Sequence, residues 1–143
     1  MKDSTRRLVF LVSALMFSTA VVYFLAAYFE FNEEDVSEHG AQIEIMLFTV
    51  VGITHVPLAI WILKNKMNSR APYVISIIIS LVLIGLYGAA RIISLPIVGL
   101  ESGFGEIDVI SKILQVGIIV ISVLLLPELK KNQRYEIHGS DEK

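Results

Sequence analysis

Four ionisable residues lie inside or beside long apolar runs of this sequence: Glu44, Arg91, Asp108 and Lys112. Two are acidic and two are basic, and the spacing of Asp108 and Lys112 makes them neighbours on one face of a helix. An unpaired charge at the centre of a membrane helix costs roughly 2.5 to 3.5 kcal/mol, so we expect these charges to pair. Two roles suit the set: a salt-bridge network that orders the helices, or an outward-facing polar cavity that binds a ligand.

Three further polar residues have the spacing to join this set. His55 lies near the middle of its apolar run, where it serves either as a hydrogen-bonded interior residue or as a proton-relay or ligand-binding group. Tyr87 precedes Arg91 by one helical turn, and Gln115 follows Lys112 at a comparable step. The predicted network or ligand cavity therefore comprises Glu44, His55, Tyr87, Arg91, Asp108, Lys112 and Gln115.

A second group of candidate ligands lies in the connections between apolar runs. Glu38, His39, Glu101 and Glu106 supply carboxylates and one imidazole, which could bind a divalent cation. Their spacing matches neither HExxH nor an EF-hand loop, and a solvated acidic loop explains the same residues. We expect no cofactor, with a divalent metal as the open possibility. The sequence has no cysteine, which excludes disulfides and thiolate metal sites.

Recognisable catalytic motifs do not occur. The sequence contains no GxxxxGK[ST] phosphate loop and no nucleophile elbow, and its Ser, His and Asp residues form no known signature. The sequence therefore leaves open whether the protein is an enzyme, and the lack of a catalytic motif favours a non-enzymatic role.

Composition indicates the elements that must position these residues. Hydrophobic residues make up 55% of the 143-residue chain, and its mean hydropathy is +0.69. Four apolar runs are each long enough to cross a hydrocarbon core of about 30 Å as a helix. We predict an all-α, integral membrane four-helix bundle of up-down-up-down topology. Its single domain covers 1–129, with helices at about 8–29, 41–64, 71–94 and 107–127, and a polar cytoplasmic tail covers 130–143.

The distribution of Lys and Arg predicts the orientation, because cytoplasmic loops hold the positive charge. Basic residues gather before the first run, between the second and third, and after the fourth, whereas EFNEEDVSEHG has none. Both termini are therefore predicted to be cytoplasmic in a multi-pass protein of the cell membrane.

Helical spacing also predicts which face of each helix points inward, because polar and small side chains avoid lipid. We expect a kink without a break at Pro57, Pro72 in the first turn of the third helix, and the end of the fourth helix at Pro127. Gly85 and Ala89 form a small-xxx-small pair that allows a close helix approach. The predicted interior lines are Ser13, Met16, Ala20, Tyr23 and Ala27; Glu44, Phe48, Val51 or Gly52, and His55; Tyr73, Ser76, Ser80, Ile84, Tyr87 and Arg91; and Asp108, Lys112, Gln115, Ile119 and Ser122.

The segments EHG and QIE, followed by AARIISLPIVGL and GEIDVISKILQ, resemble those of small, uncharacterised four-helix integral membrane proteins of ammonia-oxidising archaea, with looser actinobacterial relatives. The resemblance covers roughly residues 38–126. It implies a fold and a compartment, and it carries no activity. The matching residues are Glu38, His39, Glu44, Arg91, Pro96, Gly99, Asp108 and Lys112.

Two functional hypotheses follow. The first is an accessory or assembly subunit of a membrane complex, because the polar groups are few and balanced. The second is a small binder or transporter for a cation or solute, acting at the outward-facing cavity. The expected partners are the lipid bilayer and either subunits of a membrane complex or further copies of the chain, and no nucleic acid.

Overall fold

The computed structural model describes residues 3–32, 39–65, 67–92 and 106–140, with the backbone alone at 39–41, 90–91 and 131–140. The described residues form helices and one turn. The helices are α1 (Asp3–Asn32), α2 (His39–Asn65), α3 (Ala71–Ile92) and α4 (Glu106–Ser140). This part of the chain is therefore all-helical, as the four apolar runs predict.

All four helices are long and apolar enough to cross a membrane. The spans are Asp3–Asn32, Gln42–Asn65, Ala71–Ala89 and Glu106–Lys130. Helices suit this solvent because each backbone N–H group finds a carbonyl within its own segment, and hydrocarbon offers none. The prediction is therefore confirmed in part: the structure has four α-helices whose length and composition allow them to span a membrane.

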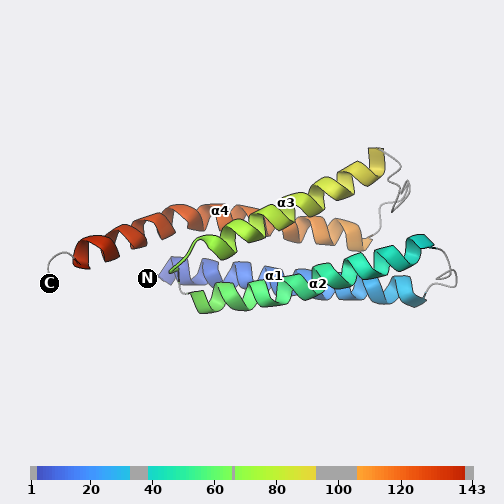
Figure 1. Ribbon diagram of the computed structural model, residues 1–143, viewed down its shortest axis with the longest axis horizontal. Helices are drawn as coiled ribbons and strands as arrows, with labels where there is room; N and C mark the ends of the chain where they lie inside the picture. The colour runs from blue at the N-terminus through green and yellow to red at the C-terminus, as the bar shows by residue number, and fades with distance from the viewer. Residues whose placement is uncertain (1–2, 33–38, 66, 93–105, 141–143) are drawn as a thin grey trace.

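The helices lie side by side with their long axes roughly aligned, and successive helices run in opposite directions (Figure 1). Helix α1 packs against both α2 and α4, and α3 packs against α4. Helices α2 and α3 make few contacts with each other. The packing is thus uneven, with α1 and α4 holding the two helix pairs together.

Large apolar side chains remain exposed along every helix. Phe10 is 68% exposed, Met46 66%, Ile78 54% and Ile113 66%. A protein dissolved in water would bury most of these groups, whereas lipid is as apolar as they are. The exposed surface supports a membrane environment.

Aromatic side chains are exposed near the helix ends. Trp61 lies in the last turns of α2, and Tyr28 and Phe29 lie near the end of α1. All three side chains are exposed. Such positions suit rings that anchor a helix in the headgroup region.

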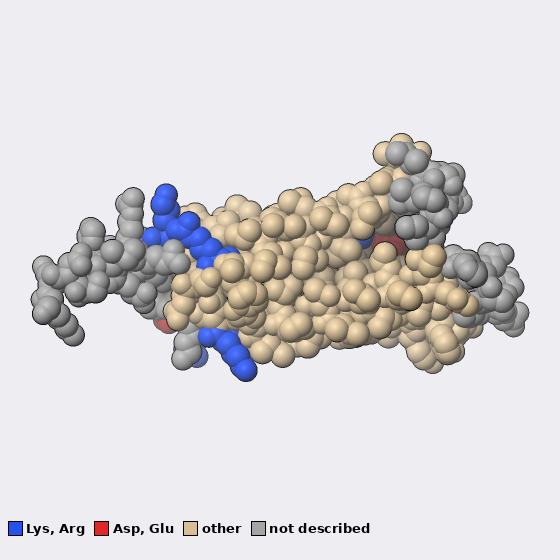
Figure 2. Space-filling model, viewed as in Figure 1, with Lys and Arg blue, Asp and Glu red and all other residues tan. Residues whose placement is uncertain are grey.

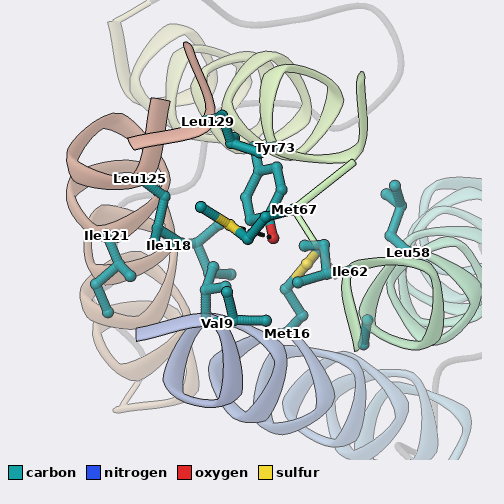
Figure 3. Packing of buried hydrophobic residues seen from close by; sticks show 12 residues of the cluster. Val9, Met16, Leu58, Ile62, Met67, Tyr73, Ile118, Ile121, Leu125 and Leu129 are labelled. Carbon is teal, nitrogen blue, oxygen red and sulfur yellow. Dashed lines mark hydrogen bonds between the residues drawn. The ribbon is translucent and has the colours of Figure 1, made fainter. Parts of the chain in front are cut away.

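An apolar cluster joins the four helices in the half of the bundle that holds the α2–α3 turn (Figure 3). Side chains from α1, α2 and α4 meet there beneath Tyr73 of α3. Its buried members are Val9, Val12, Met16, Leu58, Ala59, Ile62, Met67, Tyr73, Ile118, Ile121, Leu125 and Leu129.

The turn between α2 and α3 is closed by side chains. The Asn65 amide donates to the Ser69 carbonyl at 2.6 Å, and the Ser69 N–H donates to Asn65 Oδ1 at 3.1 Å. Met67 has a φ of 70°, an uncommon left-handed conformation for a residue other than glycine. Its side chain is only 2% exposed, and the Tyr73 hydroxyl lies 3.5 Å from its sulfur atom. Packing of Met67 in the core offsets the cost of this backbone conformation.

The prediction that α4 ends at Pro127 is wrong. The helix continues through Pro127 to Ser140, so much of the tail predicted at 130–143 is a continuation of α4. A proline removes one backbone hydrogen bond, but neighbouring helices can hold the segment together. Leu125 and Leu129, on either side of Pro127, are both 0% exposed and anchor α4 across it.

At Pro57 the absence of a break is confirmed while the kink stays a prediction, and the position of Pro72 is confirmed. Helix α2 runs unbroken through Pro57 from His39 to Asn65. Pro72 is the second residue of α3, where its missing N–H has no helical partner to lose.

The predicted close approach at Gly85 and Ala89 is absent from the described part of the bundle. A Cβ atom at Gly85 would meet nothing within 4 Å, and the same holds at Gly88. The tight glycines are Gly52, whose Cβ would lie 2.9 Å from the Phe24 ring, and Gly117, whose Cβ would lie 3.2 Å from Leu15. The α3 glycines therefore lie on a surface that no other described segment covers.

Candidate polar site in the bundle interior

The predicted interior line of α1 is confirmed over its whole length. Ser13, Met16, Ala20, Tyr23 and Ala27 are all buried, with exposed fractions from 0 to 8%. The lines on the other helices hold in part. Gly52, His55, Tyr73, Ser76, Ser80, Gln115 and Ser122 are buried, whereas Glu44, Phe48, Ile84, Tyr87, Asp108, Lys112 and Ile119 are half-buried.

Tyr23 is the central residue of the polar interior, and the sequence analysis did not place it in the site. The Gln115 amide nitrogen Nε2 donates to the Tyr23 hydroxyl oxygen at 2.6 Å, which joins α4 to α1. Tyr23 is 5% exposed and Gln115 is 0% exposed. The sequence could have predicted this role for Tyr23. The residue lies on the inward-facing line of α1, and its hydroxyl group needs a hydrogen-bond partner in lipid.

Lys112 reaches the same hydroxyl group from one turn earlier on α4. Its Nζ lies 3.5 Å from the Tyr23 oxygen and 4.6 Å from the centroid of the Tyr87 ring. An ammonium group over an aromatic face is attracted by the negative charge of the π system. Lys112 therefore contacts side chains of both α1 and α3.

His55 is 1% exposed and lies beside the Tyr23 ring, with the two ring centroids 6.2 Å apart. Its Nδ1 lies 2.8 Å from the Val51 carbonyl oxygen, and in a neutral ring that contact requires the proton to be on Nδ1. In that tautomer Nε2 is an acceptor. This geometry matches the interior hydrogen-bonding role among the two that the sequence allowed.

Of the four charged residues in the predicted network, the structure describes the side chains of three. Glu44, Asp108 and Lys112 are half-buried. Arg91 belongs to α3, but its side chain lies outside the described residues. Pairing between Arg91 and the acidic residues stays a prediction.

The metal hypothesis falls mostly outside the described residues. Glu38 and Glu101 are not described, and for His39 only the backbone is. Glu106 is the exposed first residue of α4. Among the described side chains, no group of three or more His, Asp or Glu residues could hold a metal ion.

Among the described residues, three buried polar atoms on α3 and α4 have no hydrogen-bond partner: Ser80 Oγ, Gln115 Oε1 and Ser122 Oγ. Two other buried serines instead donate to backbone carbonyls. Ser13 donates to the Ala59 carbonyl at 2.8 Å, and Ser76 donates to the Pro72 carbonyl at 2.6 Å. An unpaired buried polar group costs about 1 to 3 kcal/mol, so these three atoms are the places where the interior could accept a further polar group.

The arrangement offers hydrogen-bond donors, acceptors and one ammonium group, without an assembled nucleophile and base among the described side chains. Comparison with protein-family models, with curated proteins and with solved structures found no match to this chain.

Proposed function

We propose that this protein is a non-enzymatic accessory or assembly subunit of a membrane complex, which docks a partner's transmembrane helix on α3. The observation that carries the proposal is the uncovered position of Gly85 and Gly88, which have open space where a side chain would project. Small residues on a membrane helix allow another helix to approach closely. Because no described helix of this chain takes that place, a helix from another subunit fits it.

The polar interior supports a structural role for the charges. Gln115 bonds to Tyr23, and Lys112 contacts both Tyr23 and Tyr87, so α1, α3 and α4 are joined by polar contacts within the chain. Such contacts set the rotation and depth of each helix, which lipid-facing apolar groups cannot do. An accessory subunit needs this defined arrangement in order to present one face to its partner.

In the proposed arrangement both termini lie in the cytoplasm. The described basic side chains gather mainly at the end where the chain begins (Figure 2). Arg6, Arg7, Lys64, Arg70 and Lys130 belong to segments at that end. This distribution supports the proposed orientation, because basic residues favour the cytoplasmic side of a membrane.

The absence of cysteine makes the orientation simple to test, because one introduced thiol is the only one in the chain. In intact cells, Asn32→Cys should react with a membrane-impermeant maleimide. Asp3→Cys should react only after permeabilisation. The reverse pattern would contradict the orientation.

The docking proposal is tested by purifying the full chain from mildly solubilised membranes of its native host and measuring which proteins accompany it stoichiometrically. Gly85→Leu and Gly88→Leu should remove the partner without unfolding the protein. Ser18→Leu, a small-to-large change on the exposed side of α1, is the matched control and should retain it. Equal loss in all three variants, or no loss with the glycine variants, would contradict docking on α3.

The alternative is a small cation or solute binder with an outward-facing polar cavity. It is favoured by Gln115 Oε1, a buried acceptor in the polar half of the bundle that has no partner among the described side chains. Thermal unfolding against a panel of divalent metals and small solutes tests this alternative, because a ligand stabilises the state that binds it. A selective shift that Glu44→Gln, His39→Ala or Gln115→Leu removes would favour it over the accessory role.

A further inference from the structure

An open groove of about 450 Å³ lies on α1, lined by Arg6, Arg7, Phe10 and Leu11. It occupies the first turns of the helix, at the basic end of the bundle (Figure 2). The two apolar side chains are 68% and 46% exposed, and both arginines are exposed as well.

The spacing of the four residues sets two basic side chains beside two apolar ones on α1, and the lining of the groove itself is mostly apolar. Phe10 lies one turn after Arg6, and Leu11 one turn after Arg7, so each arginine is followed along the helix by an apolar side chain. The arginines lie towards the helix end and the apolar pair towards the middle of the span. This polarity matches a lipid molecule, with its headgroup at the membrane surface and its chains inside.

The two exposed arginine side chains are available for a ligand. Within the described chain, neither the Arg6 nor the Arg7 guanidinium has a hydrogen-bond or ion-pair partner. Guanidinium groups bind phosphate oxygens in a bidentate geometry, and two of them together favour a group with net negative charge.

We propose that this groove binds one anionic phospholipid, with its phosphate held by Arg6 and Arg7 and an acyl chain lying along Phe10 and Leu11. A zwitterionic lipid has the same chains but no net charge, so it gains less from the two arginines. The proposal depends on α1 crossing the membrane and is independent of the accessory function.

The experiment is a lipid titration of the detergent-purified full chain, with binding measured by native mass spectrometry. Phosphatidylglycerol and phosphatidylcholine with matched acyl chains are the two probes, and inorganic phosphate is a competitor. We expect phosphatidylglycerol to bind at least about tenfold more tightly than phosphatidylcholine, in keeping with the attraction of anionic lipid for basic residues. Inorganic phosphate should compete weakly because it lacks the chains.

Variants locate the site. The double variant Arg6→Gln/Arg7→Gln should weaken phosphatidylglycerol binding about 30-fold, whereas Lys130→Gln, a neutralised exposed lysine of α4, should change it less than about threefold. Phe10→Ala/Leu11→Ala should weaken binding of long-chain phosphatidylglycerol more than that of its dihexanoyl form.

Equal binding of the two lipids, or equal losses from the arginine and lysine variants, would overturn the proposal in favour of general attraction between the basic end and lipid. Full competition by inorganic phosphate would also overturn it, because the groove would then be a site for a soluble anion. Unchanged circular dichroism in each variant ensures that a loss of binding is not a loss of fold.

Discussion

Near the α2–α3 turn the helices meet over an apolar cluster that includes Met16 and Ile118, whereas in the other half of the interior the side chains in contact are Tyr23, His55 and Gln115. The first region consists mostly of close-packed hydrocarbon (Figure 3). The second contains hydrogen bonds, ring contacts and an ammonium group. One bundle thus uses two kinds of contact between its helices.

The difference follows from the solvent. Apolar side chains gain little by leaving lipid for a protein interior, so the apolar half is held by close packing. Polar side chains do gain, because their alternative in hydrocarbon is an unpaired group. Truncating a buried side chain should therefore lower the free energy of unfolding most in the apolar half. In the polar half, removing a hydrogen-bond partner should have the corresponding effect.

The largest effect is expected from Ile118→Ala in the apolar half. Ile118 is 0% exposed, and its truncation leaves a cavity, so the free energy of unfolding should fall by about 2 kcal/mol. Circular dichroism during titration with sodium dodecyl sulfate measures this change. Ile113→Ala on the same helix is the control; Ile113 is 66% exposed, and the change should be within about 0.5 kcal/mol. Similar losses in both variants would contradict the assignment of the interior face.

In the polar half, Tyr23→Phe should lower the free energy of unfolding by about 1 kcal/mol, the scale of one hydrogen bond between membrane helices. The variant keeps the ring and removes the acceptor of the Gln115 amide. The same unfolding titration applies, with Tyr28→Phe as the control at a residue 62% exposed. A Tyr23→Phe protein as stable as the wild type would mean that the hydroxyl does not join α1 to α4.

A smaller effect is expected when Gln115→Leu is added to Tyr23→Phe. The double variant should recover about 0.5 kcal/mol or more relative to Tyr23→Phe, because no unpaired amide remains buried. The double-mutant cycle measures the coupling between the two side chains. Strictly additive losses would show that the contact contributes nothing to stability.

No loss of stability is expected on the uncovered face of α3. Gly85→Leu should leave the free energy of unfolding unchanged or raise it by up to about 1 kcal/mol, because the new side chain meets no neighbour and leucine favours a helix. Gly52→Leu is the contrasting variant and should destabilise, because the Phe24 ring must move away. Destabilisation by Gly85→Leu to the same extent would place α3 against another part of the chain.

Much of the fold followed from local patterns. The four spans and the buried line from Ser13 to Ala27 were predicted from run length and helical spacing alone. Burial of Met67 was not predicted, because its segment, KNKMNSR, is polar and basic. The extension of α4 past Pro127 was missed for a related reason, since packing of Leu125 and Leu129 outweighs the local effect of the proline.

The candidate site was predicted as a set of residues but not as a set of contacts. His55, Tyr87, Lys112 and Gln115 were all assigned to the site. Tyr23, the side chain that Gln115 and Lys112 share, was predicted only as an interior residue of α1. Helical spacing identifies the inward face of one helix at a time. It contains no information on the depth at which that face meets the next helix.

The sequence by itself determined that the chain forms long apolar helices, which face of α1 is buried and at which end the basic residues gather. These properties depend on neighbours within one helix, because hydropathy and helical spacing act locally. The tertiary structure decided that Gln115 bonds to Tyr23, that Met67 enters the core and that Gly85 and Gly88 are uncovered while Gly52 is packed. Those outcomes depend on the rotation and relative depth of whole helices, which are set by all of their contacts together.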